Sequence, residues 1–368
     1  MERRTRHETG FQYLFTLGIV VGVAIGLITT LFQINPFISD ELLLSQNTDE
    51  DDSYELQKSL QMISENQIQP SSNLPGTLLK RAEEVLARMI SAEVKILCLV
   101  MTNSTRKAAH HVKLTWGRHC NKLIFISDGN DESLPSADVG KEWHREGSWA
   151  KTNGALKYVW RKYREEFDWI IKTNDKNYVF VENLQEMLLP YTPDEPIFFG
   201  FRMNPILPQG YMSENAGLVM SKEVVMRLVN NAFDGKDKKC PQWNDNKHPD
   251  DIKMGICLAA VNAVAGDSRD WEGRNRFFPM DVATHAFVQP TKYKWFWTYT
   301  FWPAFIGMEG CADTPVSFHY IKPAVMYAIE YLAFTVRPFV VNHLEMNTPA
   351  PTPASANLNQ TTPAVAGK

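Results

Sequence analysis

"FDWIIKTNDKNYVF", residues 167–180, is the stretch that decides the fold. Its apolar run "WII" is typical of a buried strand, because such strands are short apolar runs bounded by polar turns. The run stops in the polar group "KTNDKN", after which aromatic and β-branched residues resume. Ligands of open α/β sheets bind beyond the carboxyl ends of the strands. The polar group therefore predicts a functional site at a strand end, such as a metal site or what is left of one, or only a turn.

The flanking sequence continues this pattern of short apolar runs and amphipathic stretches. We expect strands at residues 94–102, 121–128, 168–173 and 196–203, and helices at residues 154–167, 182–191 and 221–233, the last with Ser221 as its N-cap. Strands that alternate with helices predict an α/β fold with a mostly parallel central sheet, in one domain over residues 92–341. Neither a Walker loop nor GxGxxG occurs, so a nucleotide would be held in another way.

The composition limits the class of protein. The chain has 368 residues, 44% of them hydrophobic, which is enough for one large or two medium domains. Its net charge of −4 and its isoelectric point near 6.2 argue against a nucleic-acid partner, because nucleic-acid binders normally carry a basic surface.

Residues 11–33 predict a membrane anchor. They contain an uncharged run, Phe11 to Phe32, that is long enough to cross a bilayer core of about 30 Å as one helix. The alternative is a cleaved signal peptide, but signal peptides have a shorter apolar core and a small-residue cleavage site. Arginines precede the run and an acidic "DEDD" follows it. The positive-inside rule then predicts a cytosolic tail at residues 1–10 and a lumenal location for the rest of the chain.

The segments on either side of the expected domain differ from it in composition. Residues 34–91 are expected to form a polar lumenal stem that ends in a helix at residues 76–90. Residues 342–368 are rich in Thr, Pro and Ala, which predicts a disordered tail. Asn103 and Asn359 each begin an acceptor sequence for N-linked sugar.

The five cysteines suit an oxidising compartment, in which an even number of them pair and one remains. Cys98 and Cys120 lie at neighbouring strand ends and form one expected disulfide, and Cys240 with Cys257 forms another. Cys311 is then unpaired or joined to a second chain. Zinc binding is the alternative use of cysteines, but no Cys-x-x-Cys spacing occurs.

Four further segments suit a functional site, and each also has a plainer explanation. Asp250 and Asp251 begin an expected helix, where carboxylates also favour the positive end of the helix dipole. "KWFWTYTFW", residues 294–302, alternates aromatic side chains between two faces, which suits core packing or stacking on a sugar ring. His319 lies in the apolar run "VSFHY", where most histidines are structural. "GYMSENAGLVMSKE", residues 210–223, predicts a loop that leads into a strand and a helix, or only a turn.

Five stretches together give the chain a specific resemblance to a known family. In chain order they are "KAAHHVKLTWGRHCNKLIFISD", "DWIIKTNDKNYV", "GYMSENAGLVMSKE", "DDIKMGIC" with "AVNAVAGDSRD", and "VSFHYIKPAVMYAIEYLAFTVRPF". Their order and spacing resemble the core 1 β1,3-galactosyltransferases, which are animal Golgi enzymes of the wider β1,3-glycosyltransferase group. The resemblance implies a GT-A glycosyltransferase fold and a single-pass Golgi membrane protein with a lumenal catalytic domain. It also implies inverting transfer of galactose from UDP-galactose to the 3-hydroxyl of GalNAc linked to Ser or Thr of glycoproteins.

The resemblance assigns roles to individual residues. Asp251, in the acidic pair with Asp250, matches the base that takes the proton from the attacking sugar hydroxyl. Family members bind a divalent cation, usually manganese, which neutralises the leaving diphosphate. Asp175 and His319 match ligands of that cation. The expected donor site contains Lys113, Trp116, Asn174, Asp175 and Lys176, and the expected acceptor pocket contains Tyr211, Glu214, Asn215, Trp295, Trp297 and Tyr299.

The chain departs from the family pattern in the stretch quoted first. Three consecutive aspartates of the family fall on Asn174, Asp175 and Lys176, and the third is the one expected to bind the metal. A charged lysine ammonium is a donor without a lone pair, and hard divalent cations need oxygen ligands. We therefore expect the metal site to be severely weakened.

Two more departures concern the pocket and the cysteines. Glu214 and Asn215 replace a pair of glycines that line the substrate pocket, so side chains occupy space that bare backbone leaves open. Gly310 replaces one of two adjacent cysteines, which explains the odd Cys311.

Three functions are compatible with these residues. The first is a galactosyltransferase in which Lys176 supplies positive charge in place of a metal. The second is a non-catalytic chaperone or glycan-binding partner of active family members, because one branch that lost its acidic triplet serves as a chaperone. The third is a transferase with a changed donor or acceptor. Retention of the acidic pair, "AGDSRD" and His319 favours catalysis. A homodimer, or a heterodimer with a related transferase, is a further expectation.

Overall fold

The structure is a computed structural model, and it describes residues 76–102, 108–127, 129, 132–138, 148–242, 245, 247–287, 292–305 and 307–336, with side chains from Val85 onward. The expected anchor, most of the stem, both glycosylation sequons and the C-terminal tail lie outside these residues. Among the helices within them, none has both the length and the apolar character needed to cross a membrane.

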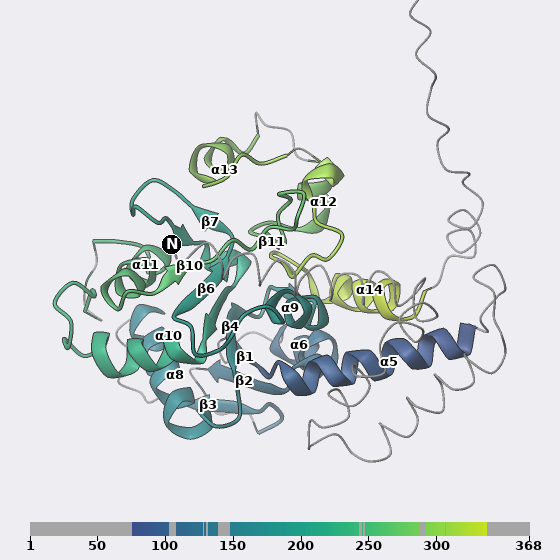
Figure 1. Cartoon of the computed structure of the whole chain (residues 1–368), viewed down its shortest axis with the longest axis horizontal. Helices are drawn as coiled ribbons and strands as arrows, with labels where there is room; N and C mark the ends of the chain where they lie inside the picture. Colours follow the sequence, from purple (N-terminus) through teal and green to yellow (C-terminus); the bar gives the residue numbers. More distant parts are fainter. Residues whose placement is uncertain are drawn as a thin grey trace, which may run out of the picture.

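A mixed, mostly parallel sheet of seven strands forms the centre of the described part of the chain (Figure 1). Its order is β10-β6-β9-β4-β1-β2-β3, and its neighbouring strands are parallel except where β9 pairs with β4 and β6. The strands are β1 (Ile96–Met101), β2 (Lys122–Ser127), β3 (Ser136–Asp138), β4 (Trp169–Asn174), β6 (Ile197–Gly200), β9 (Leu218–Ser221) and β10 (Val264–Ala265). The expected strands and the mostly parallel sheet are confirmed.

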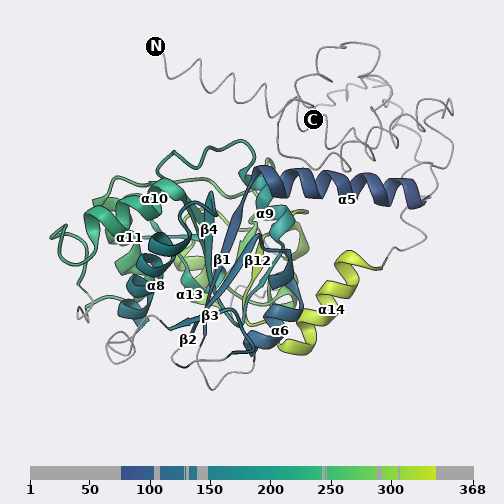
Figure 2. The same cartoon turned by 90° about the horizontal axis from the view of Figure 1, so that it is seen from below.

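Helices cover both faces of this sheet. Their bounds are α5 (Gly76–Glu93), α6 (Ala108–Leu114), η1 (Trp116–His119), α8 (Ser148–Tyr163), α9 (Val181–Leu188), η2 (Glu214–Ala216), α10 (Lys222–Arg227), η3 (Leu228–Ala232), α11 (Asp250–Ala260), α12 (Val282–Ala286), α13 (Lys294–Tyr299), η4 (Gly307–Gly310) and α14 (Pro323–Phe334). Figure 2 shows α8, α10 and α11 on one side of the strands and α5, α6 and α9 on the other.

The side chains of β1 explain the two-sided packing. Successive residues of a strand point to opposite faces of the sheet. Ile96, Cys98 and Val100 are buried in the core that contains α6 and α9, whereas Leu97 and Leu99 are buried in the core that contains α8, α10 and α11. Both faces of the strand are buried, which is why its sequence is a continuous apolar run.

Two small sheets extend the central one. A three-stranded sheet has the order β11-β12-β5, with β11 (Phe277–Phe278), β12 (Ser317–Phe318) and β5 (Tyr178–Val179). The other pairs β7 (Arg202–Met203) with β8 (Tyr211–Met212). Because β12 pairs antiparallel with β5, it brings residues 317–320 beside the turn that follows β4.

Two local expectations have different outcomes. Ser221 is the N-cap of α10, and its Oγ accepts a hydrogen bond of 3.2 Å from the backbone N–H of Val224, as predicted. The prediction that aromatic side chains alternate between two faces over residues 294–302 is wrong, because residues 294–299 form the short helix α13. Phe296 of that helix is buried and stacks on Phe201, with ring centroids 5.4 Å apart.

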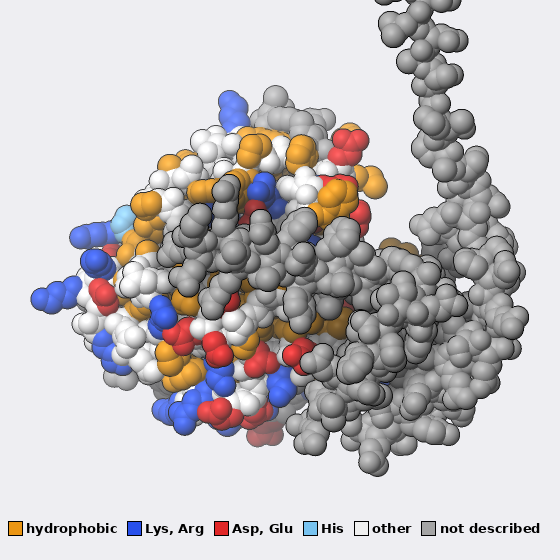
Figure 3. All heavy atoms as spheres, in the orientation of Figure 1, with side chains coloured by type: hydrophobic (Ala, Val, Ile, Leu, Met, Phe, Trp, Pro, Cys, Tyr) orange, Lys and Arg blue, Asp and Glu red, His pale blue; other side chains and the backbone are white. Residues whose placement is uncertain are grey.

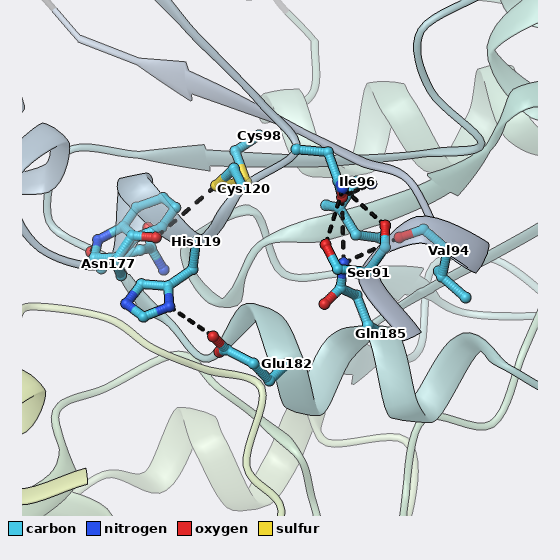
Figure 4. Close-up of a disulfide and its surroundings, with 11 residues drawn as sticks. Ser91, Val94, Ile96, Cys98, His119, Cys120, Asn177, Glu182 and Gln185 are labelled. Atoms are coloured by element: carbon cyan, nitrogen blue, oxygen red, sulfur yellow. Dashed lines mark hydrogen bonds and ion pairs between the residues drawn. A yellow bond between two sulfur atoms is a disulfide. The ribbon is translucent and has the colours of Figure 1, made fainter. Parts of the chain in front are cut away.

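Both expected disulfides are present. Cys98 of β1 is bonded to Cys120, just beyond η1 (Figure 4), and Cys240 is bonded to Cys257 of α11. Cys311 is half-buried and outside any disulfide in the described part of the chain. The first bond lies in the core on the α6 and α9 side, and the second lies in the core on the opposite face.

A polar cluster fixes α14 to the rest of the domain. Glu330 of α14 accepts a hydrogen bond of 2.7 Å from the Tyr178 hydroxyl of β5, and its other oxygen lies 2.8 Å from His119 Nε2. Arg118 donates to the same oxygen. Nδ1 of His119 lies 2.6 Å from Glu182 of α9 (Figure 4). The cluster thus joins η1, β5, α9 and α14.

Candidate functional site

The turn after β4 carries three residues of the expected donor site. Asn174 ends β4, and its Oδ1 accepts a hydrogen bond of 2.9 Å from the backbone N–H of Lys176. Asp175 is fully buried, and its Oδ2 accepts a hydrogen bond of 2.7 Å from the hydroxyl of Thr102, just beyond β1. Lys176 is exposed. The turn therefore holds its carboxylate inward and leaves its lysine at the surface.

His319 lies beside the same turn. Its Nδ1 is 3.3 Å from Asn177 Oδ1, and the backbone N–H of Ile321 donates a hydrogen bond of 2.9 Å to the Lys176 carbonyl. Burial, and then the positive charge of Lys176, lower the pKa of His319 to about 4. Lys176 Nζ also lies 5.7 Å from the ring centroid of Tyr320, a cation–π distance. The imidazole is thus neutral at neutral pH and lies close to a cation.

These residues do not fit a divalent cation such as manganese. The two expected ligands, Asp175 and His319, are one carboxylate and one imidazole, and a hard cation prefers several oxygen ligands. The charge of Lys176 acts on His319, and it would also repel a bound cation. Within the residues that the structure describes, no three His, Cys, Asp or Glu side chains are grouped as metal ligands.

A pocket of about 340 Å³, part of it open to solvent, contains the acidic pair. It lies between β4, β8, η2 and the helices α8 and α11. Its walls are formed by Trp149, Thr152, Lys172, Met212, Glu214, Leu218, Asp250, Asp251, Met254, Gly255 and Leu258. Gly255 lets α11 pack closely against β8, because a Cβ at this position would lie 2.8 Å from Tyr211 Cβ of β8.

The two aspartates at the start of α11 differ in their surroundings. Asp250 Oδ2 accepts a hydrogen bond from the Ser148 hydroxyl of α8, and its Oδ1 lies 3.4 Å from Lys253 Nζ. Asp251 Oδ1 accepts a hydrogen bond of 2.8 Å from the backbone N–H of Ile252. Burial raises the pKa of Asp251, and the charges of Glu214 and Asp250 raise it further. Asp250 thus joins α8 to α11. The raised pKa of Asp251 makes its carboxylate a better proton acceptor, as a base requires.

Glu214 forms an ion pair across the pocket wall. Lys172 of β4 is buried, and its Nζ donates a hydrogen bond to Glu214 Oε1. The charge of Lys172 lowers the pKa of Glu214, so this carboxylate is ionised. Asn215 is exposed, and its carbonyl accepts a hydrogen bond of 2.7 Å from Asn177 Nδ2. Asn177 therefore joins the turn after β4 to η2, which contains Asn215, and to His319.

One of the expected acceptor-pocket aromatic residues, Tyr211, lies near Asp251. Tyr211 is buried, and burial raises its pKa, with the charges of Asp251 and Tyr299 adding to the effect. Tyr299 and Trp295 of α13 are 42% and 38% exposed, which leaves ring surface open for stacking on a ligand. Hydrophobic side chains also gather where α12 and α13 lie in Figure 1, at the top of the face drawn in Figure 3.

The structure separates three other expected residues from the pocket. Trp297 lines a different hollow, partly open to solvent, with His285 and Cys311. Trp116 is fully buried, and its Nε1 donates a hydrogen bond of 2.8 Å to the Asn177 carbonyl, so it supports the turn from behind. Lys113 Nζ donates a hydrogen bond of 2.6 Å to the Ser133 carbonyl.

Sequence reasoning missed Lys172, Thr102 and Asn177. Lys172 gave a signal, because a lysine within the buried run "WIIKT" requires a partner. Thr102 and Asn177 gave none, since their partners come from distant parts of the chain.

Comparisons with known proteins indicate the family of the chain. A Fringe-like family model matches residues 102–268. Glycoprotein-N-acetylgalactosamine 3-beta-galactosyltransferase 1 of Xenopus laevis is 37% identical over 252 residues, which are 67% of this chain and 68% of that protein. Human beta-1,3-glucosyltransferase is 27% identical over 178 residues, which are 47% of this chain and 34% of that protein.

A solved structure shows a weaker likeness. It is a glycosyltransferase involved in the glycosylation of the major capsid of PBCV-1, with 9% identity, a TM-score of 0.34, and coverage of 65% of this chain and 99% of that one. This score is too low to support an argument, whereas the Xenopus laevis relative matches two thirds of both chains. The chain belongs to the core 1 β1,3-galactosyltransferase family.

Proposed function

We propose that this protein transfers galactose from UDP-galactose to the 3-hydroxyl of GalNAc linked to Ser or Thr of glycoproteins, with inversion. Its family is one of glycosyltransferases, which supports the reaction class. The observation that carries the proposal is Asp251, a carboxylate of raised pKa that lines a pocket together with Asp250 and Glu214. A base of this kind is what a sugar hydroxyl needs in order to attack.

The reaction is a single displacement. The acceptor O3 bonds to C1 of galactose while the bond from C1 to the UDP oxygen breaks, and the hydroxyl proton passes to Asp251. Asp250 positions the first turn of α11 through Ser148 and Lys253. Tyr299 and Trp295 offer faces on which an acceptor sugar can stack.

The leaving diphosphate needs positive charge, and in this protein we assign that role to Lys176 in place of a metal. Lys176 is exposed at the turn after β4, where ligands of α/β sheets bind. An ammonium can contact a phosphate oxygen through a charge-assisted hydrogen bond. Manganese is expected from the family, but Asp175 and His319 alone are a poor ligand set for it.

A non-catalytic partner of active family members is the second candidate. The loss of two of the three aspartates favours it, because leaving-group stabilisation then depends on a single lysine. A transferase with another donor or acceptor is the third, and the replacement of pocket glycines by Glu214 and Asn215 favours that reading.

The full chain, purified in detergent, can be assayed with UDP-galactose and a GalNAc-peptide in EDTA and in manganese. We expect galactosylated peptide in both, with little gain from manganese. Product in manganese alone would contradict the role of Lys176. No transfer and no affinity for UDP would favour the non-catalytic partner. Transfer of another sugar, or to another acceptor, would favour the third candidate.

The GT-A fold and the Golgi membrane location are part of this proposal. A mixed sheet with a smaller sheet at the strand ends supports the fold, and the disulfides support an oxidising lumen. Protease treatment of sealed microsomes should trim the N-terminal tail alone. A shortened, secreted product that begins after Phe32 would instead show a cleaved signal peptide.

A further inference from the structure

Lys172 is an unusual residue for the middle of a central strand. It belongs to β4, which pairs with β1 on one side and β9 on the other, and its side chain is 5% exposed. A buried ammonium is costly unless it is paired and hydrogen-bonded. Its carboxylate partner is Glu214. The pair therefore fixes where the carboxylate of Glu214 lies.

Lys172 is the buried member of this pair, and Glu214 is the member that lies at the pocket surface. Its side chain is 39% exposed, and it lines the pocket that contains Asp250 and Asp251. The lining holds three carboxylates and one ammonium, Lys172. Lys253, outside the lining, pairs with Asp250, so the carboxylates exceed the neighbouring ammonium groups by one. A cavity with this excess of negative charge repels an anion, and its carboxylates accept hydrogen bonds from hydroxyls.

The two carboxylates beside Asp251 are not equivalent as hydrogen-bond acceptors. Both oxygens of Asp250 have partners, Ser148 and Lys253. Glu214 uses Oε1 for Lys172, and Oε2 has no hydrogen-bond partner among the described residues. Oε2 of Glu214 can therefore accept a hydrogen bond from a ligand.

We propose that Glu214, held by Lys172, is a specificity-determining residue that selects an uncharged, hydroxyl-bearing sugar and rejects a sugar that carries a carboxylate. Its Oε2 accepts a hydrogen bond from a hydroxyl next to the one that Asp251 deprotonates. This inference rests on the proposed function, because it takes the pocket to be the acceptor pocket.

Binding measurements test the inference without requiring turnover. The probes are benzyl α-N-acetylgalactosaminide, which is neutral, and benzyl β-glucuronide, which is anionic, each titrated into the full chain in detergent with UDP present. The wild type should bind the neutral probe at least about tenfold more tightly than the anionic one. Glu214→Gln should weaken binding of the neutral probe about tenfold, because a charge-assisted hydrogen bond is lost. It should also reduce the preference over the anionic probe.

Two further variants control for folding and for charge in general. Glu214→Gln leaves Lys172 without its carboxylate, so Lys172→Met with Glu214→Gln removes both charges and should show the same loss of preference in a folded protein. Glu223→Gln removes a carboxylate on α10 that pairs with Arg227, outside the pocket, and should bind both probes like the wild type.

Wild-type affinities for both probes in the double variant would overturn the inference, as would failure of the wild type to bind the neutral probe. The transfer assay separates this inference from the proposed function. Probe preference that depends on Glu214 without any transfer would support the inference and contradict the proposed function. Transfer with a preference independent of Glu214 would contradict the inference alone.

Discussion

The Thr102 hydroxyl donates a hydrogen bond of 2.7 Å to Asp175 Oδ2, across 73 residues of sequence. The two residues follow neighbouring parallel strands, whose register pairs Met101 with Asn174. The bond holds the one carboxylate of the turn against the interior. This geometry contributes to the defined shape of the turn.

Thr102→Val should lower the free energy of unfolding by about 1–3 kcal/mol, because one hydrogen bond of a buried carboxylate is then unmade. Urea unfolding followed by fluorescence measures this, and Thr102→Ser, which keeps the hydroxyl, should lose much less. An unchanged urea midpoint for Thr102→Val would show that the bond contributes nothing.

Lys176→Ala should weaken UDP binding in EDTA by about tenfold, because a diphosphate oxygen loses a charge-assisted contact. Lys176→Asp should make UDP binding depend on manganese, because it returns a carboxylate next to Asp175. Calorimetry with EDTA and with manganese measures both, and Lys222→Ala on α10 is a matched control. Tight manganese-dependent binding by the unmodified protein would refute the role of Lys176.

Asp251→Asn should lower kcat about 10²–10⁴-fold and leave UDP affinity nearly unchanged, since a positioned base acts on the acceptor proton. Asp250→Asn should reduce turnover less and should lower the unfolding temperature, because it weakens the contact with Ser148. Initial rates and thermal unfolding of both variants check this. Full turnover in Asp251→Asn would move the base elsewhere.

The pH dependence of kcat/KM should follow the raised pKa of Asp251. A base acts when deprotonated, so the rate should fall as the pH drops through that pKa, above the ordinary value of 3.8 for an aspartate. Rates in overlapping buffers test this. A flat profile down to pH 4 would contradict an elevated pKa.

The Glu330 cluster predicts a window of maximal stability. Burial alone would lower the pKa of His119, but hydrogen bonds to Glu182 and Glu330 raise it from 6.5 to about 9, so its contribution is full below pH 6.5 and is lost as the pH rises through 9. Burial alone would raise the pKa of Glu330, but hydrogen bonds from His119 and Tyr178 lower it from 4.5 to about 2. That contribution is full above pH 4.5 and is lost as the pH falls toward 2.

The loss of stability in Glu330→Gln should therefore be largest between pH 4.5 and 6.5. Thermal unfolding of the variant and the wild type across pH measures the difference, and Glu309→Gln, an exposed residue, is the control. A difference that stays constant from pH 2 to 10 would rule out this linkage.

Local patterns predicted the sheet well, and long-range contacts account for most of what they missed. The runs "VKILCLVMT" and "DWIIKT" predicted β1 and β4, because a strand that is buried on both faces has a short, continuous apolar sequence. The pairing of Cys98 with Cys120 followed from the expected strand ends. The contact between Tyr178 and Glu330 joins residues 152 apart, and no local pattern reports it.

The aromatic segment failed for a different reason. Trp, Phe and Tyr favour strands, so alternation in "KWFWTYTFW" resembled a strand. In the fold, Phe296 packs on Phe201, and a single helical turn accommodates that contact. Tertiary packing thus overrode local preference, and it left Trp295 and Tyr299 exposed while Trp297 lines a different hollow.

The two disulfides have a consequence for producing the protein. One cross-links the core on each face of the sheet, and they span 22 and 17 residues. A disulfide that closes a loop of this length stabilises a fold by about 3 kcal/mol. Two such bonds together supply a large part of the roughly 5–15 kcal/mol that keeps a domain folded. Expression in the reducing cytoplasm of ordinary bacterial hosts should therefore yield aggregated chains, and secretion from a eukaryotic host should yield soluble ones.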